Sequence, residues 1–229
     1  MANHSGKVGG ISALIASATV IVGLGMFATM LSDYASGDPT PSESIAFLVD
    51  NQAALYIWNL ITLIVFSVVL VPLALALYSR LKERSGWLAP TGTAFGMIWA
   101  GILIGAGMLL NIGAGTIVDL AESDPAQAES LWLAVDSVGN GLSGGMEIVG
   151  PIWILLISLA ALKAGTLPKA LNYLGVVISA AGLVTIVPAL ETVGAIFGLG
   201  LIIWLAWLGF VMLREQEAPL KAAPAGKAG

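Results

Sequence analysis

Six long apolar stretches constrain most strongly what this chain can fold into. They cover residues 8–31, 53–78, 88–118, 131–162, 171–190 and 192–214. Each is long enough to cross a hydrocarbon core of about 30 Å, which needs roughly 20 residues of helix. With 58% hydrophobic and 10% charged residues, the chain also lacks the polar surface of a soluble globule. The sequence therefore predicts an all-α polytopic membrane protein in a lipid bilayer, with a single six-transmembrane-helix bundle in residues 1–214.

Charged residues divide sharply between alternate connections of the predicted spans. All nine basic residues lie at the N-terminus, after the second and fourth spans, or in the C-terminal tail: Lys7, Arg80, Lys82, Arg84, Lys163, Lys169, Arg214, Lys221 and Lys227. The other connections carry only acidic charges: Asp33, Asp38, Glu43, Asp50, Asp119, Glu122, Asp124, Glu129 and Glu191. Basic loops stay on the cytoplasmic side, so we expect both termini to be cytoplasmic. An acidic outer face excludes nucleic acid as a partner, because phosphate binding needs clustered bases.

Residue types that support cofactor chemistry are scarce. The chain has no cysteine, which excludes disulfides, thiol nucleophiles and thiolate metal sites. The single histidine, His4, precedes the first span, so paired histidines cannot hold a haem. We therefore expect no cofactor and no metal.

Two outer connections carry signals for helix starts. Thr40-Pro41-Ser42-Glu43 combines a capping residue, a first-turn proline and a capping-box glutamate, and Asp124-Pro125-Ala126-Gln127 repeats the pattern. The first predicts a short external helix that leads into the second span, and the second predicts that the fourth span starts outside the bilayer. The low-complexity tail, residues 215–229, is expected to be a disordered cytoplasmic segment.

A polar stripe runs along the fourth predicted span, residues 131–162. At about 100° per residue, six positions fall on one arc of a continuous helix: Asp136, Asn140, Ser143, Glu147, Gly150 and Ser158. Pro151 cannot donate to the carbonyl of Glu147, so a kink is expected beside this carboxyl group. Because polar groups are costly inside a membrane, such a stripe indicates a functional site.

Polar residues of three spans are expected at one depth. Counting about 20 residues from each cytoplasmic end places Asn59, Asn111 and Ser143 near the outer hydrocarbon boundary, with Glu147 one turn deeper. This predicts a polar cup open to the outside. No base lies on that side, so Glu147 is expected either to be protonated or to pair with a cation. The predicted ligand-binding residues are Glu147, Asn140, Ser143, Asn111, Asn59 and Asp136.

Structural explanations compete with this hypothesis. A neutral Glu147 bonded to Asn59 or Asn111 would simply join helices, at about 1 kcal/mol per hydrogen bond. Asp136 would then be a hydrated residue at a helix start. Gly101 and Gly105 form a GxxxG pattern that favours close packing of membrane helices. The fifth span carries Gly175, Ser179 and Gly182 on one side, and tryptophans such as Trp153 and Trp204 are expected in the core or facing lipid.

Several segments resemble a known family. They are WNL at residues 58–60, AFGMIWAG at 94–101, NIG at 111–113, NGLSGGMEIVG at 140–150, LPKALNYLG at 167–175 and GAIFGLGLIIWLAWLG at 194–209. In these segments the chain is similar to the bacterial membrane proteins grouped as domain of unknown function 4386. The resemblance implies six helices and a bacterial plasma membrane, and it assigns no catalytic residue.

Three classes of function remain open from the sequence. The first is a protein that binds or transports a small polar or cationic ligand, or a proton, in the outer cup. The second is an accessory or structural subunit that packs against a membrane-protein partner or forms a homo-oligomer. The third is an enzyme with Asp136 and Glu147 as acid and base, but about 16 Å along a helix separates them, too far for a shared proton transfer. Transport is disfavoured because carrier sites lie near the midplane. We therefore expect binding or assembly, and no enzymatic activity.

Overall fold

The computed structural model describes residues 2–31, 39–143 and 148–217, and all regular elements in these ranges are helical. The α-helices are α1 (Ala2–Met26), α3 (Pro41–Asn59), α4 (Phe66–Ser85), α5 (Leu88–Ser123), α6 (Pro125–Ser143), α7 (Val149–Ala164), α8 (Lys169–Leu183) and α9 (Gly194–Glu217). Two π-helical turns, η1 (Phe27–Leu31) and η2 (Leu60–Val65), extend α1 and join α3 to α4. Two 3-10 turns, η3 (Val184–Ile186) and η4 (Pro188–Val193), join α8 to α9.

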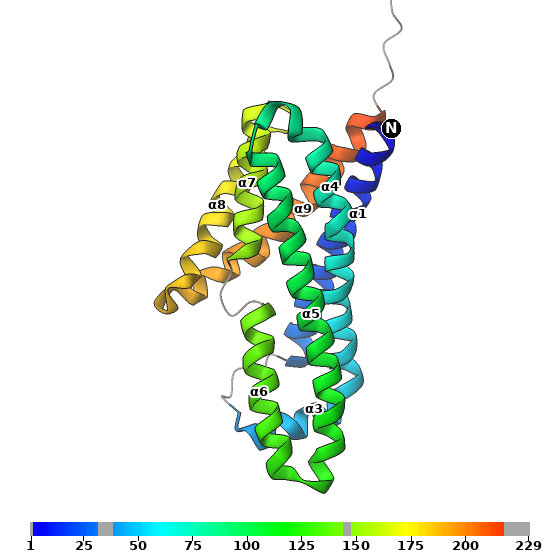
Figure 1. Ribbon diagram of the computed structural model, residues 1–229, viewed down its shortest axis with the longest axis vertical. Coiled ribbons are helices and arrows are strands. Elements are labelled where there is room, and N and C mark those ends of the chain that lie inside the picture. Colours follow the sequence, from blue (N-terminus) through cyan, green and yellow to red (C-terminus); the bar gives the residue numbers. More distant parts are fainter. Residues whose placement is uncertain (1, 32–38, 144–147, 218–229) are drawn as a thin grey trace, which may run out of the picture.

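The helices form a bundle that is thick at one end and thinner at the other (Figure 1). The thick end contains α1, α4, α5, α7, α8 and α9, with α1 packed on both α4 and α9. The thinner end contains α3, α6 and the C-terminal half of α5, which extend beyond the ends of α8 and α9 (Figure 1). The 36-residue α5 belongs to both parts and connects them.

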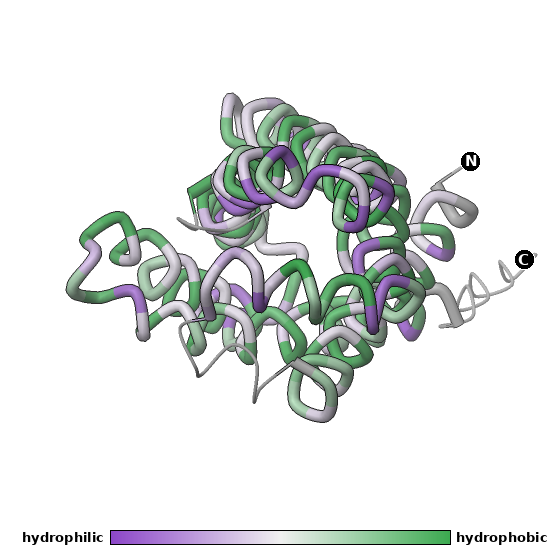
Figure 2. The backbone as a smooth tube through the Cα atoms, turned by 90° about the horizontal axis from the view of Figure 1, so that it is seen from below, coloured by the Kyte–Doolittle hydropathy of each residue, from purple (hydrophilic) through white to green (hydrophobic). Residues whose placement is uncertain are grey.

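The helices have the length and apolarity of membrane spans. Five candidate spans are present in the described residues, and α7 is a sixth apolar helix of 16 residues, about 24 Å long. Large apolar side chains also lie on the outside of the bundle, for example Ile112 at 73% exposure and Val177 at 61%. Figure 2 shows such hydrophobic positions around the helices as well as between them. The chain is thus an all-α polytopic membrane bundle, as predicted, while its sidedness stays a prediction.

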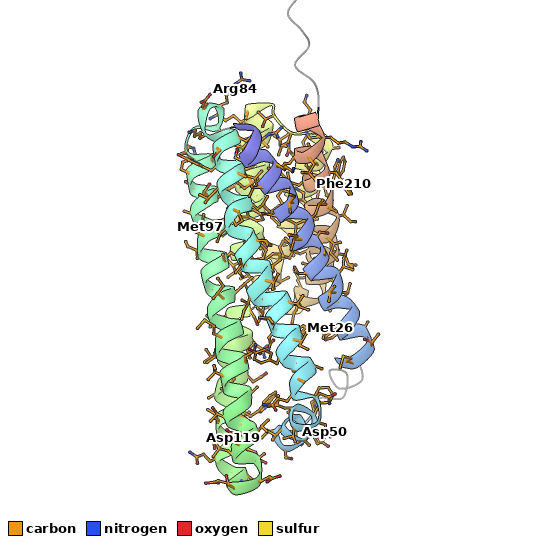
Figure 3. The ribbon with its side chains drawn as sticks, turned by 90° about the vertical axis from the view of Figure 1, so that its right-hand side faces the viewer. Met26, Asp50, Arg84, Met97, Asp119 and Phe210 are labelled. Carbon is orange, nitrogen blue, oxygen red and sulfur yellow. The ribbon has the colours of Figure 1, made fainter. Side chains whose placement is uncertain are left out.

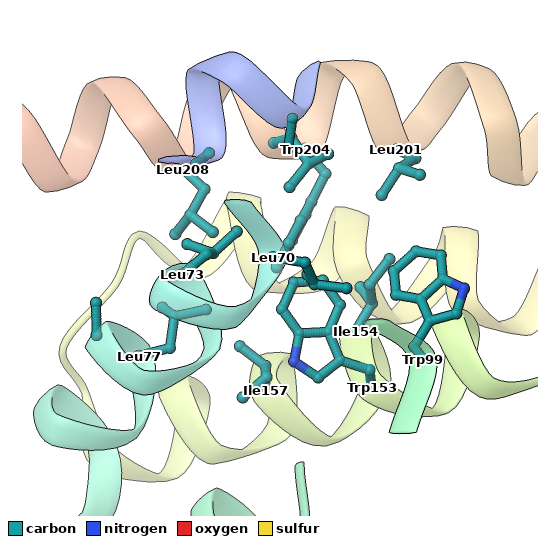
Figure 4. Packing of buried hydrophobic residues seen from close by; sticks show 14 of the residues in the cluster. Leu70, Leu73, Leu77, Trp99, Trp153, Ile154, Ile157, Leu201, Trp204 and Leu208 are labelled. Atoms are coloured by element: carbon teal, nitrogen blue, oxygen red, sulfur yellow. The ribbon is translucent and has the colours of Figure 1, made fainter. Parts of the chain in front are cut away.

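Tryptophans form the centre of the core at the thick end. Trp153 and Trp204 are fully buried, with ring centroids 5.7 Å apart, and Trp99 lies 5.8 Å from Trp153. Phe66 continues the row with an edge contact to Trp99 at 5.2 Å. Leucine and isoleucine side chains from α4, α7 and α9 surround these rings (Figure 4). The row joins α4, α5, α7 and α9, and the tryptophans are core residues, as the sequence indicated.

Charges separate to the two ends of the bundle. The α4–α5 turn and the α7–α8 turn lie side by side, and the Arg80 guanidinium donates a 2.7 Å hydrogen bond to the Thr166 carbonyl between them. Figure 3 places Arg84 at this end and Asp50 and Asp119 at the opposite end. The division of charge in the sequence is therefore a division in space.

Both predicted helix starts are present. The amide and hydroxyl of Thr40 each donate a 2.8 Å hydrogen bond to Glu43, and the Glu43 amide donates back to the Thr40 hydroxyl at 3.3 Å. Asp124 accepts a 3.1 Å hydrogen bond from the Gln127 amide at the start of α6. The first helix continues through a kink at Asn51, where φ is −120°, into the second predicted span.

A Thr40→Val substitution tests the capping box. Losing the hydroxyl cap costs about 1 kcal/mol of local helix stability. Hydrogen exchange of the amides in the first turn of α3 should therefore become about fivefold faster. Thr116→Val is the matched control, because Thr116 only donates to the carbonyl of Ile112 one turn earlier in its own helix. Equal exchange rates in wild type and Thr40→Val would show that the cap contributes nothing.

The prediction of one continuous helix over residues 131–162 is wrong. The polypeptide forms α6 up to Ser143 and a separate helix, α7, from Val149, with Ile148 outside both. Pro151 lies in the first turn of α7, where its missing N–H costs no hydrogen bond, rather than at a kink inside a helix. Glycines before the break weaken helix formation, so a new start is favoured over a bend. Gly150 and Ser158 consequently lie in the core and not on the stripe of α6.

The other spans differ in length from their predictions. The second extends from Pro41 to Ser85, through the kink at Asn51 and the π-helical turn η2, and the third extends to Ser123. α8 ends at Leu183, seven residues before the predicted end of the fifth span, and 3-10 turns follow. α9 begins at Gly194 and includes residues 215–217 of the predicted tail, whereas residues 218–229 lie outside the described residues.

The glycines divide into packed and open positions. Gly175 contacts the side chains of Ser158 and Trp204, and Gly182 contacts Pro151 and Phe197, so the predicted small face of α8 is buried. In contrast, no atom of the described chain lies within 4 Å of a Cβ placed at Gly101 or Gly105. The GxxxG pattern therefore does not pack against another helix within the described residues.

Candidate functional site

A cavity of about 470 Å³ lies between α3, α5 and α6, at the end of the bundle that carries the acidic charges. We call it the outer cavity. Its polar lining comes from α3, η2 and α6: Ser44, Tyr56, Asn59, Thr62, Asp136, Asn140 and Ser143. Apolar residues such as Leu48, Ile117 and Val135 close its walls and form a second, smaller core. The size is within the range of about 300 to 1,000 Å³ found for small-molecule sites.

Asn59 and Asn111 join two helices beside this cavity. The Asn59 Nδ2 donates a 3.1 Å hydrogen bond to Asn111 Oδ1, and Asn111 Nδ2 donates to the Tyr56 carbonyl at 3.4 Å. Asn59 is buried, at 8% exposure, whereas Asn111 is half-buried. The pair explains why both asparagines lie at one level, and it leaves Asn59 facing the cavity.

An Asn111→Leu substitution tests the energy of this pair. The buried Asn59 amide would lose its acceptor, and we expect the unfolding free energy to fall by about 1 kcal/mol. Asn59→Leu and the double variant complete a thermodynamic cycle, measured by denaturant unfolding in detergent micelles. A coupling energy close to zero would show that the hydrogen bond does not stabilise the bundle.

Polar groups on α6 are available to a ligand. Asp136 is half-buried and Asn140 is exposed, and neither hydrogen-bonds to another side chain within the described ranges. Asp136 is also the one carboxylate among the described residues that line the cavity, and no base lines it. The described Lys and Arg residues belong to the opposite end of the bundle. The cavity therefore favours a neutral or cationic molecule over an anion.

A second hollow of about 300 Å³ adjoins the outer cavity, and we call it the inner cavity. The two share Phe27, Trp58, Thr62, Leu63 and Ser143 in their linings. The inner cavity continues between α1, α5 and α9, with Leu24, Phe66, Trp99, Leu103 and Leu201 in its lining. The two hollows differ in their chemistry, because Asp136, Asn59 and Asn140 line only the outer cavity, whereas the described lining of the inner cavity has no charged or amide side chain.

A comparison with models of known sequence families identifies the family to which this chain belongs. The model of the family described as Domain of unknown function (DUF4386) matches residues 8–214. The chain belongs to this family. No curated protein and no solved structure matches it. The expected family membership is therefore confirmed, and the match includes every residue that lines the two cavities.

Most residues of the predicted cup in this DUF4386 chain come together. Asn59, Asp136, Asn140 and Ser143 line the outer cavity, and Asn111 bonds to Asn59 at its edge. Glu147 lies outside the described residues, so its role stays a prediction. Asp136 does not stand at a helix start, because α6 begins eleven residues earlier at Pro125. Whether these residues bind a ligand stays a prediction too.

Several lining residues were not predicted from the sequence. One of them is Trp58, whose Nε1 donates a 3.0 Å hydrogen bond to the Gly23 carbonyl of α1 and whose side chain lines both cavities. Phe27 and Thr62 belong to the π-helical turns η1 and η2. Such wide turns are frequent at functional sites, yet no sequence pattern marks them. In the described part of the chain no group of His, Cys, Asp and Glu could hold a metal ion.

Proposed function

We propose that this chain is a multi-pass protein of the bacterial plasma membrane that binds a small neutral or cationic molecule from the outer side, without chemical turnover. In this proposal both termini are cytoplasmic. The outer cavity then opens away from the cytoplasm. The observation that carries the proposal is the convergence of Asn59, Asp136, Asn140 and Ser143 on one cavity of about 470 Å³.

The chemistry of the lining supports binding rather than catalysis. Asparagine and serine side chains orient a ligand through hydrogen bonds, and a carboxylate favours a cation. The described lining holds one carboxylate and no histidine, lysine or cysteine, so it offers no acid–base pair or activated nucleophile.

Native mass spectrometry of protein extracted gently from its own membrane tests the proposal. Wild type should retain a small bound mass, and Asp136→Asn should lose most of it. Glu129→Gln, on the same helix but outside the lining, is the matched control and should retain it. A wild-type protein without a bound mass, which also takes up no added cation, would contradict the proposal.

A role in assembly is the second candidate, and the open glycines favour it. Gly101 and Gly105 are exposed and have no neighbour within the described chain, which leaves room for a second helix to approach closely. A Gly101→Leu substitution should then abolish association with a partner or with a second copy. A single oligomeric state shared by wild type and variant would contradict this role.

A further inference from the structure

We infer that the ligand is an amphiphile, with a cationic head in the outer cavity and a single hydrocarbon chain in the inner cavity. This inference rests on the proposed function and adds the chemical class of the ligand. It comes from the connection between the cavities and from the contrast between their linings.

The two cavities adjoin each other and share part of their linings. Five residues belong to both linings, and three of these, Trp58, Thr62 and Leu63, follow one another across the α3–η2 junction. The volumes are about 470 Å³ and about 300 Å³. A molecule longer than the outer cavity can therefore extend past Trp58 into the inner one.

Of the four side-chain polar hydrogens in the described lining of the inner cavity, three are used within the chain, and the Trp99 indole N–H is the fourth. The Thr62 hydroxyl donates to the Trp58 carbonyl at 2.7 Å, and the Ser143 hydroxyl donates to the Gly139 carbonyl at 2.8 Å. The Trp58 indole N–H is used by the Gly23 carbonyl. A polar group placed there could replace only a few of its hydrogen bonds to water, and each one lost costs about 1 to 3 kcal/mol. A hydrocarbon chain has no such cost.

The outer cavity suits a cationic head. Asp136 supplies a negative charge, and Tyr56, Trp58 and Trp132 place aromatic rings in the same lining. Carboxylates and aromatic faces together attract quaternary ammonium groups. An anionic head would instead be repelled by Asp136, with no base in the described lining to compensate.

The side of the inner cavity formed by α1 gives access from the bilayer. Leu24 on α1 and Phe27 on η1 line the cavity and are 48% and 40% exposed, so these two side chains do not close it. Neighbouring side chains on α1, such as Ile21, are exposed and apolar as well. A hydrocarbon chain can therefore pass between lipid and cavity without crossing a polar surface.

Binding of a homologous series of alkyltrimethylammonium salts tests the inference. The full chain in lipid nanodiscs is titrated with tetramethylammonium, butyltrimethylammonium and octyltrimethylammonium, and empty nanodiscs provide the background. Each methylene that enters the inner cavity should lower Kd about fourfold, so the octyl compound should bind at least about 100-fold more tightly than tetramethylammonium.

Two tryptophan variants show where the hydrocarbon chain of the ligand binds. Leu24→Trp enlarges a partly exposed lining residue and should weaken octyltrimethylammonium binding at least about tenfold, without changing tetramethylammonium binding. Ile21→Trp is the matched control, since Ile21 lies on the same helix, at 53% exposure, and outside the lining. Its affinity for both compounds should equal that of wild type.

Failure of the inference is distinguishable from failure of the proposed function. If tetramethylammonium binds and Asp136→Asn abolishes it, but chain length or Leu24→Trp has no effect, the proposed function stands and the amphiphile is excluded. If no compound binds above background, the cationic amphiphile is excluded, and the native mass spectrum of the wild-type protein and Asp136→Asn decides the proposed function by itself. If a membrane lipid stays bound through purification, the amphiphile comes from the bilayer. If the cavities hold only the compound that was added, the amphiphile comes from solution.

Discussion

Trp153→Ala is expected to destabilise the bundle by about 3 to 5 kcal/mol, the usual cost of truncating a large buried aromatic residue. Trp153 is fully buried and packs between Trp99 and Trp204, so its loss removes contacts with α5 and α9 at once. Gly96 packs against the same indole ring, which leaves no larger neighbour there to fill the space. The unfolding free energy is measured by denaturant titration in mixed micelles.

Trp207→Ala is the control for this prediction. Trp207 lies on α9, as Trp204 does, but it is 38% exposed on the outer face. Its truncation should cost less than about 1 kcal/mol. Equal losses for the two variants would mean that the row of aromatic rings is not the centre of stability.

Asp136→Lys is expected to weaken the binding of a quaternary ammonium ion by at least about 100-fold. The substitution replaces the carboxylate in the described lining of the outer cavity by a cation, at an end of the bundle that otherwise carries acidic charges. Two like charges about 4 Å apart near a protein surface repel by roughly 4 kcal/mol before screening by salt. Kd for tetramethylammonium, measured by calorimetry in nanodiscs, gives the size of the effect.

Two controls accompany Asp136→Lys. Glu129→Lys makes the same change of charge on α6 outside the outer cavity, so it should alter Kd by less than about threefold. A thermal unfolding curve of Asp136→Lys establishes that the variant is folded. A folded Asp136→Lys protein with wild-type affinity would show that the ammonium group binds elsewhere.

Local sequence signals predicted much of the fold. The capping box at Thr40, the side-chain cap at Asp124, the small face of α8 and the division of charge are each present because they depend on neighbouring residues or on spacing along one helix. The polar stripe of α6 was found for the same reason. Three of its residues, Asp136, Asn140 and Ser143, are three or four positions apart and line one cavity.

Features that depend on contacts between helices were not predictable. The break between α6 and α7 was mistaken for a kink, because apolar composition continues across it and Pro151 fits either a bend or a first turn. The inner cavity arises from the meeting of α1, α5 and α9, which are far apart in the sequence. Depth counting predicted the common level of Asn59 and Asn111, but their hydrogen bond follows from the packing of α3 against α5.

In the proposed function, the outer cavity opens to the outside of the cell and holds a ligand. Cysteine labelling tests it most directly, since the chain has no native cysteine. We would introduce Asn140→Cys into the outer cavity, Ser123→Cys at the end of α5 and Glu83→Cys near the basic turn, all at exposed positions. A membrane-impermeant maleimide is then added to intact spheroplasts, with and without octyltrimethylammonium.

We expect that Asn140→Cys is labelled in intact spheroplasts and that the ammonium compound slows its labelling at least about fivefold. Ser123→Cys should be labelled at the same rate with and without the ammonium compound. Glu83→Cys should be labelled only after permeabilisation. Labelling of Asn140→Cys only after permeabilisation would contradict the outward orientation of the cavity, and labelling that the ammonium compound does not slow would contradict ligand binding there.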